Sequence, residues 1–156
     1  MPPEFGQDPM DQYSIPLDSE TTILAILFQL NPREKPEKPG RSLVVEYDDR
    51  VPLVPYFETK YAYTVTFSKP GKQAGNHFHR QKAEIMRPVI GSVTVRLEDQ
   101  KTKVREEHLL NATNHQAIYI RPEIAHVVIS QSEPTVLLVM ATHPNNEADE
   151  FPYQLS

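Results

Sequence analysis

The sequence predicts an all-β fold, a small antiparallel sandwich or barrel with little helix, and three observations support this. The 156 residues include 15 prolines, which leave few windows long enough for a helix because proline breaks a helix interior. The segments between the prolines are rich in β-branched and aromatic residues, which favour strands. Several segments alternate apolar and polar side chains, as half-buried strands do. Many short strands separated by turn residues are typical of sandwiches and barrels.

The first part of the chain is expected to be a tail. Residues 1–20 are acidic and proline-rich, and we expect them to be disordered, so that residues 21–156 form a single domain. TTILAILFQL, residues 21–30, is predicted to be the first strand, with a short helix as the alternative. NPREKPEKPG, residues 31–40, is a polar loop. The strand-rich body is therefore expected to begin at Arg41.

The body contains seven segments with the composition of strands, and they are residues 41–47, 60–68, 91–99, 103–110, 116–122, 125–130 and 135–142. In the third of them, Val93, Val95 and Leu97 are expected to share one face and the residues between them the other. The acidic end, residues 143–156, is expected to lie on the surface.

Composition and charge exclude several classes of function. The net charge is −5, with 16 basic and 21 acidic residues, which argues against a nucleic-acid binder because such proteins carry a basic face. There is no cysteine, so disulfides, thiolate metal sites and cysteine nucleophiles are excluded. The longest apolar run, ILAILF at residues 23–28, is far shorter than the roughly 20 residues of a membrane span. We therefore expect a cytoplasmic protein without a membrane partner.

The stretch AGNHFHRQKAEIMRPVIGS, residues 74–92, carries the strongest signal for a site. Residues two apart on a strand project to the same face, so His77 and His79 are expected to point together. Glu84 begins the next strand, and it returns to the same face if that strand pairs antiparallel with the first. His126, which follows a turn containing Pro122, is the candidate for a fourth ligand. Imidazoles and a carboxylate on one face suit a divalent first-row metal.

The pattern His77-x-His79-x4-Glu84-x6-Gly91 resembles the first motif of the cupins. The second motif is looser, because IYIRPEIAHVV has the proline and the histidine but lacks the intervening glycine and the later asparagine. The flanks, RSLVVEYDDRVPLVPYFETKYAYTV and TVLLVMATHPNNEADEFPY, resemble the WxcM-like, sugar-nucleotide 3,4-ketoisomerase branch. The resemblance spans residues 41–153. It implies a cupin-type antiparallel β-barrel, that is, a double-stranded β-helix or jelly roll.

The sequence departs from this branch at three positions. Members usually carry a basic residue where this chain has Ala74, and a small residue where it has Phe78. They commonly carry a glutamine at the position of Glu84 and are understood to work without metal. Glu84 therefore favours a metal-binding cupin.

Two chemistries follow, and a third class stays open. In the first, His77, His79, Glu84 and His126 hold one divalent ion, Fe, Mn, Ni, Cu or Zn, which acts as a Lewis acid or as an oxygen-activating centre of the dioxygenase type. In the metal-free alternative, His77 or His79 removes a proton beside a sugar keto group and returns it to the neighbouring carbon. Histidine suits this role because its unperturbed pKa is about 6.5. The third class is a non-catalytic small-molecule binder.

The resemblance favours an isomerase-type enzyme with a carbohydrate-type substrate, such as a nucleotide-sugar. Small cupins commonly pair through outer strands, so we expect a homodimer, with ILAILF as the candidate contact. Of the remaining histidines, His108 and His115 are expected at the surface, and His143 is a weaker candidate for the mouth of the barrel. Further candidates for a substrate pocket are Tyr61, Tyr63 and Arg87.

Overall fold

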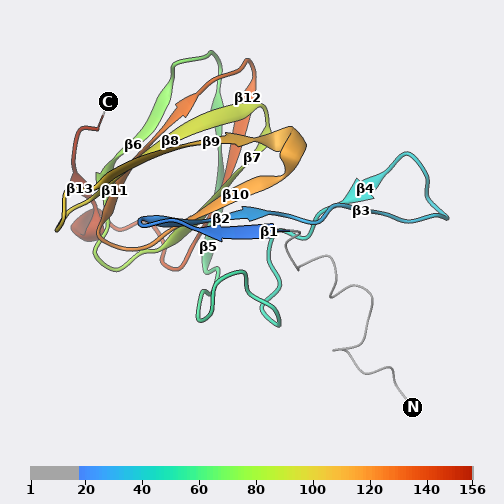
Figure 1. Cartoon of the computed structure of the whole chain (residues 1–156), viewed down its shortest axis with the longest axis horizontal. Coiled ribbons are helices and arrows are strands. Elements are labelled where there is room, and N and C mark those ends of the chain that lie inside the picture. Colours follow the sequence, from blue (N-terminus) through green and yellow to red (C-terminus); the bar gives the residue numbers. More distant parts are fainter. Residues whose placement is uncertain (1–17, 156) are drawn as a thin grey trace.

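Two antiparallel sheets enclose an apolar interior in the computed structural model, which describes residues 18–155 (Figure 1). One sheet has six strands in the order β1–β2–β10–β7–β12–β5. Their bounds are Asp18–Thr21, Ala25–Gln29, Gln116–Ile120, Glu84–Ile90, Thr135–Ala141 and Tyr61–Phe67.

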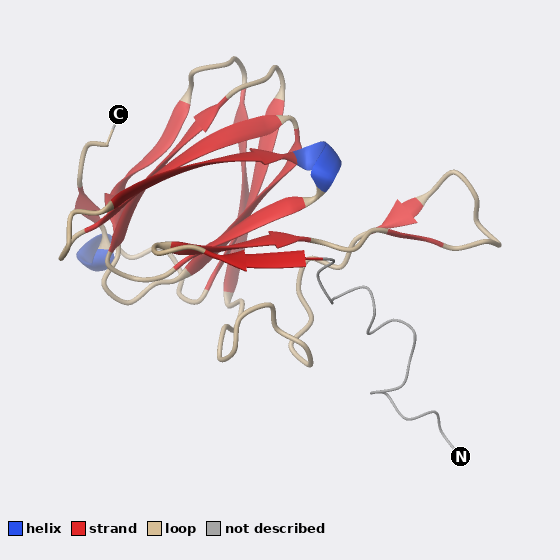
Figure 2. Ribbon diagram, in the orientation of Figure 1, coloured by secondary structure: helices blue, strands red, loops and turns tan. Residues whose placement is uncertain are grey.

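The other sheet has five strands in the order β13–β6–β11–β8–β9. Their bounds are Phe151–Pro152, Gln73–Phe78, Ile124–Ser130, Ser92–Asp99 and Arg105–Asn111. A separate hairpin of β3 (Arg33–Glu34) and β4 (Ser42–Leu43) projects from the barrel. The described residues contain no helix other than the 3-10 turns η2 (Ala112–Asn114) and η3 (Glu147–Asp149) (Figure 2). The predicted antiparallel all-β barrel is confirmed.

Strand alternation builds the interior between the two sheets. Val93, Val95 and Leu97 of β8 have no exposed surface, as the alternating pattern predicted. They pack against apolar side chains of the opposite sheet, which include Met86, Ile118, Leu137 and Val139. Because apolar burial is the main favourable term in folding, these inward faces stabilise the barrel independently of the polar residues at its site.

Several expectations about the chain's first part need correction. Strand β1 begins at Asp18, so residues 18–20 belong to a strand, while residues 1–17 lie outside the described residues. Only two residues of the predicted strand 41–47 form one, namely β4. Residues 44–57 instead form a loop whose apolar side chains cover the outer face of the six-stranded sheet, among them Val44, Tyr47, Leu53, Val54 and Phe57.

The ILAILF segment is largely buried against its own chain, so it does not present a free surface for contact with a second chain. Leu24, Ala25 and Phe28 are buried in the cores of the barrel. Only Ile23 is largely exposed, at 72%. The segment is therefore a poor candidate for a dimer contact, and the homodimer stays a prediction. No helix in residues 18–155 is long and apolar enough to cross a membrane.

Glu106 of β9 ties the edge of one sheet to the β1–β2 turn of the other. Its Oε1 accepts hydrogen bonds from the Thr22 hydroxyl (2.6 Å) and from His108 Nε2 (3.0 Å). Its Oε2 accepts the backbone N–H groups of Ile23 (3.0 Å) and Leu24 (3.3 Å). Burial raises the pKa of Glu106, but these hydrogen bonds outweigh it and the net pKa is lowered. His108, expected at the surface, is instead part of this link.

Replacing Glu106 by Gln should lower the free energy of unfolding by about 1–3 kcal/mol, because a charged acceptor of four hydrogen bonds is lost. Urea denaturation of the variant and the wild type measures the difference. The matched control is Glu107→Gln, since Glu107 is exposed on the opposite face of the same strand and pairs only with Arg96. Equal losses in the two variants would show that Glu106 does not link the sheets.

Candidate functional site

The structure brings together the four side chains proposed as metal ligands. One ligand atom from each of His77, His79, Glu84 and His126 lies within 4.8 Å of the others. The rings of His77 and His79 are 4.7 Å apart between centroids, and those of His77 and His126 are 4.9 Å apart. Glu84, His79 and His126 are almost completely buried. The cluster therefore lies inside one end of the barrel.

Alternation explains two of these positions. His126 lies between Ile124 and Val128 on the inward face of β11. Glu84 shares the inward face of β7 with Met86. The expected antiparallel pairing of the two motif strands is wrong, because β6 pairs with β11 and β13 while β7 pairs with β10 and β12. The carboxylate thus meets the histidines across the barrel interior and not along one sheet.

A β-bulge in β6 brings His77 onto the inward face. His77 pairs with His126, but the next pair is Gly75 with Val127, so that Asn76 is the extra residue. Gly75 has φ +106°, and a Cβ there would lie 2.6 Å from the backbone oxygen of His126. No other residue fits this close approach. The bulge shifts the alternation so that Ala74 and His77, three apart, both face the interior.

Each histidine of the cluster is oriented through its Nδ1 atom. Nδ1 of His79 lies 2.7 Å from the backbone oxygen of Asp149, and Nδ1 of His126 lies 3.1 Å from that of Ile124. Nδ1 of His77 lies 3.0 Å from Oε1 of Glu150. Because a carbonyl oxygen and a carboxylate only accept, each Nδ1 carries the proton, and Nε2 of the neutral ring keeps its lone pair.

The lone pairs of His79 and His126 face the carboxylate of Glu84. Oε1 of Glu84 lies 3.5 Å from Nε2 of His79 and 3.2 Å from Nε2 of His126. The buried Nε2 of His79 and Oε1 of Glu84 have no hydrogen-bond partner. Two acceptors at this distance repel each other unless a positive charge lies between them, either a proton on an imidazole or a metal ion. Since metal-bound histidines typically donate their other N–H to a carbonyl or carboxylate, the donor set fits a divalent ion.

The cluster shifts the pKa values of its members in opposite directions. Burial raises the pKa of Glu84, but His126 and His79 outweigh this and hold it well below its usual range. Burial, together with the charges of His126 and His79, lowers the pKa of His77 to about 4. Burial also lowers the pKa of His79, but Glu84 and the Asp149 carbonyl raise it further, so that the net shift is upward. The site therefore combines an ionised carboxylate with a neutral His77.

The candidate pocket residues divide between two faces. The Tyr63 hydroxyl lies 3.4 Å from Oε2 of Glu84, and burial, followed by Glu84, raises its pKa, so the phenol donates to the carboxylate. Tyr61 stacks at a tilt beside Tyr63, 5.6 Å between centroids. The expectation for Arg87 is wrong, because it points to the outer face of β7 and forms two hydrogen bonds with Glu46, at 2.8 and 2.5 Å. His143 is exposed and contacts Thr142.

Sequence reasoning missed the C-terminal segment, which was expected to lie on the surface. The buried carboxylate of Asp149 accepts the backbone N–H groups of Arg80 (2.9 Å), Gln81 (3.2 and 3.3 Å) and Lys82 (3.2 Å). The backbone oxygen of Asp149 also accepts a hydrogen bond from Nδ1 of His79. One residue therefore fixes both the loop that follows the histidines and the tautomer of His79. Acidic residues near a chain end carry no sequence signal that separates this role from a solvated tail.

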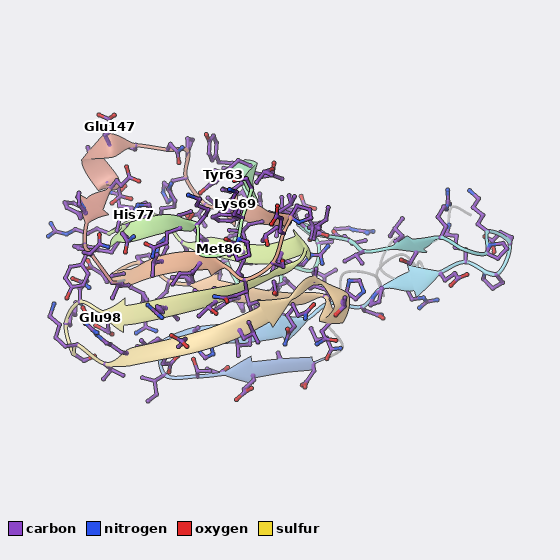
Figure 3. The ribbon with its side chains drawn as sticks, turned by 90° about the horizontal axis from the view of Figure 1, so that it is seen from above. Tyr63, Lys69, His77, Met86, Glu98 and Glu147 are labelled. Carbon is purple, nitrogen blue, oxygen red and sulfur yellow. The ribbon has the colours of Figure 1, made fainter. Side chains whose placement is uncertain are left out.

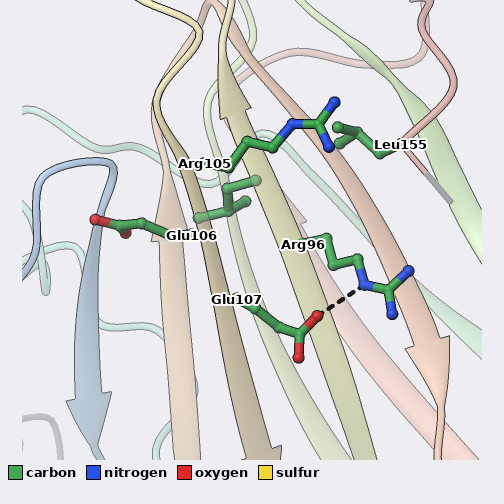
Figure 4. A pocket seen from close by; sticks show the side chains of 6 residues that line it. Arg96, Arg105, Glu106, Glu107 and Leu155 are labelled. Carbon is green, nitrogen blue, oxygen red and sulfur yellow. Dashed lines mark hydrogen bonds and ion pairs between the residues drawn. The ribbon is translucent and has the colours of Figure 1, made fainter.

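A polar pocket of about 360 Å³ opens beside the cluster, and it is lined by His79, Lys82, Asn145, Asn146, Glu147 and Glu150. Figure 3 shows His77 and Glu147 at the same end of the barrel. A second pocket of similar volume lies over β8 and β9 (Figure 4). Its guanidinium groups are already paired, Arg96 with Glu107 and Arg105 with Glu98. The pocket beside the histidines is therefore the candidate substrate site.

Replacing Asp149 by Asn should lower the free energy of unfolding at pH 7 by about 1–3 kcal/mol, because the backbone N–H groups of residues 80–82 lose a charged acceptor. Hydrogen bonds from the loop outweigh burial and lower the pKa of Asp149. Its contribution is therefore complete above the unfolded pKa of about 3.9 and is lost as pH falls through the lower folded pKa. Urea denaturation between pH 7 and pH 3 should show the two proteins converging at low pH. A pH-independent difference would contradict this account.

Solved structures with this fold include several enzymes of sugar nucleotides. A mutant of the 3,4-ketoisomerase QdtA from Thermoanaerobacterium thermosaccharolyticum, in complex with TDP-4-keto-6-deoxyglucose, has 21% identity and a TM-score of 0.67, covering 84% of this chain and 88% of that chain. The dTDP-4-dehydrorhamnose 3,5-epimerase from Bacillus anthracis, with TDP and PPi bound, has 13% identity and a TM-score of 0.69, covering 81% and 76%.

NovW, a 4-keto-6-deoxy sugar epimerase from Streptomyces spheroides, has 17% identity and a TM-score of 0.70, covering 85% of this chain and 71% of that chain. At these identities the likeness shows the fold. No curated protein matches the chain. The sequence model of the family described as FdtA: WxcM-like, C-terminal matches residues 29–153. The chain therefore belongs to the WxcM-like, C-terminal family, as the resemblance of its motifs implied.

Proposed function

We propose that this protein is an isomerase-type cupin that acts on the keto group of a carbohydrate, of the nucleotide-sugar type. The observation that carries the proposal is the group of three imidazoles and Glu84, whose ligand atoms lie within 4.8 Å of one another beside a polar pocket. Family membership supports the substrate class, since solved structures with this fold include ketoisomerases and epimerases of TDP-linked keto sugars.

The reaction needs a base whose lone pair faces the substrate. His77 or His79 removes the proton from the hydroxyl-bearing carbon beside the keto group. The C–H electron pair forms a carbon–carbon double bond, and the carbonyl π electrons move to the keto oxygen. The neighbouring hydroxyl then passes its proton to the former keto oxygen and becomes the new carbonyl, while the former keto carbon receives a proton from the imidazolium. Atoms and electrons balance without an oxidant or a reductant.

We propose as the alternative that His77, His79, Glu84 and His126 hold one divalent ion, in which case the imidazole lone pairs bind the ion and neither histidine acts as the base. The support is the buried, unpartnered Nε2 of His79 and Oε1 of Glu84, together with the Nδ1 contacts that orient all three imidazoles. The donor set accepts Fe, Mn, Ni, Cu or Zn. When bound, the ion would polarise a substrate carbonyl as a Lewis acid.

Metal analysis of the purified full chain tests the metal site. We expect about one ion per chain, lost on chelation and restored by one of the five metals. The double variant His77→Ala, His79→Ala should retain no metal but keep its circular dichroism spectrum, because the apolar faces hold the barrel. His143→Ala is the control and should bind as the wild type does. Failure of the stripped wild type to rebind any of the five ions would leave the metal-free acid–base site as the better account.

Deuterium exchange tests the isomerase. We expect the protein to replace the proton beside the keto group of TDP-4-keto-6-deoxyglucose by deuterium in D2O. Proton NMR measures the loss of that proton's signal. His77→Asn and His79→Asn should slow the exchange by roughly 10²–10⁴-fold if both act in proton transfer, while His143→Asn should not. Absence of exchange by metal-restored wild type, on this and on related TDP-keto sugars, would favour a non-catalytic binder or an oxygenase.

A further inference from the structure

Lys82 is a buried cation that has no anionic partner among the described residues. Its side chain is 5% exposed, and its ammonium donates to the neutral side chain of Asn145, 3.1 Å from Nζ to Oδ1. Within residues 18–155 no carboxylate lies within 4.0 Å of this ammonium. Arg87, the other buried Lys or Arg side chain of the described residues, has a carboxylate partner in Glu46. The two residues therefore differ in how their charge is compensated.

A buried ammonium is costly unless an opposite charge pairs with it. Lys82 lines the pocket beside His79, so a group entering that pocket reaches it directly. Its position is fixed in advance, because the Asp149 carboxylate holds its backbone N–H at 3.2 Å and Asn145 holds its ammonium. A cation held in place at the wall of a pocket is ready to receive a negative charge without reorganisation.

The rest of the pocket limits how much charge it accepts. Lys82 is the only Lys or Arg side chain among the described residues that line it. Of the two carboxylates there, Glu150 is engaged by His77 and Glu147 is exposed to solvent. The amides of Asn145 and Asn146 offer both donors and acceptors, as sugar hydroxyls require. The pocket thus suits a sugar-sized polyhydroxy group with one negative charge near His79. It lacks the cations that a diphosphate needs, so the diphosphate of a nucleotide-sugar would have to lie outside this pocket.

We propose that Lys82 binds an anionic oxygen of the ligand in this pocket. Two sources supply such an oxygen. One is a permanent carboxylate or phosphate group on the ligand. The other is the keto oxygen, which becomes negative when a histidine removes the neighbouring proton. The second source rests on the proposed function, whereas the first does not.

The first experiment measures binding to the full chain by calorimetry, with D-glucuronate and inorganic phosphate as anionic probes and D-glucose as the neutral counterpart of glucuronate. We expect the wild type to bind an anion in preference to glucose. Lys82→Met, which keeps the length of the side chain but not the charge, should weaken that binding at least about tenfold. Lys69→Met is the control, because Lys69 is an exposed lysine in the turn that precedes β6.

The second experiment uses deuterium exchange into TDP-4-keto-6-deoxyglucose. If Lys82 stabilises the developing charge, Lys82→Met should lower kcat by about 10²–10³-fold with little change in KM. Lys82→Arg should restore part of the rate, and Lys69→Met should behave as the wild type does. A permanent anion instead predicts a raised KM.

Thermal unfolding separates this role from a structural one. Lys82→Met should keep or raise the Tm, because it removes an uncompensated buried charge, whereas a structural lysine would lower it. The inference is overturned if Lys82→Met alters neither anion binding nor exchange, or if its losses follow a fall in Tm. If the wild type binds an anion through Lys82 but catalyses no exchange, the proposed function is wrong and this inference still holds.

Discussion

The candidate site depends on one constraint, the ionised carboxylate of Glu84 in an interior that excludes water. A buried carboxylate must be compensated by positive charge or by donors, or it takes up a proton. In this protein it faces the Nε2 atoms of His79 and His126, whose own protons are held at Nδ1 by backbone oxygens. Among the described residues, the Tyr63 hydroxyl is the only group that donates a hydrogen bond to this carboxylate without first taking up a proton. The site is therefore arranged to hold a cation, and the backbone oxygens that fix the imidazole protons at Nδ1 contribute to that arrangement.

The motif predicted which side chains meet, but not how they meet. Strand alternation is a local property of the chain, and it places Glu84 and His126 on inward faces, whereas a bulge places His77 there and His79 follows the end of β6. The predicted pairing of the two motif strands was wrong, since β6 and β7 belong to different sheets and a bulge at Gly75 shifts the alternation. Pairing between distant strands depends on the whole topology, and no local pattern encodes it. Arg87, by contrast, follows from a local pattern, because its neighbour Met86 faces the interior and alternation turns Arg87 to the outer face.

Roles that depend on backbone oxygens and on loops were beyond the reach of the sequence. Asp149 acts on His79 through its carbonyl group, which every residue possesses. Residues 44–47 have the composition of a strand, yet Val44 and Tyr47 pack as a loop over the six-stranded sheet because burial there outweighs local propensity. Polar side chains such as Glu106 and Glu46 secure these irregular segments to the barrel through hydrogen bonds to turns and to Arg87. The apolar interior, which the pattern did predict, supports them all.

The barrel and the C-terminal segment, residues 145–150, contribute different parts of the site, and this has a consequence for ligand specificity. Strands supply His77, Glu84 and His126, and His79 follows the end of β6. Asp149 and Glu150 orient His79 and His77 from outside the strands. The same segment contributes Asn145, Asn146 and Glu147 to the wall of the pocket. Changes in this segment therefore act on the orientation of the histidines and on the contacts to the ligand together. A protein that keeps the barrel motif but alters residues 145–150 is thus expected to differ in ligand and in reactivity at once, although its fold is the same.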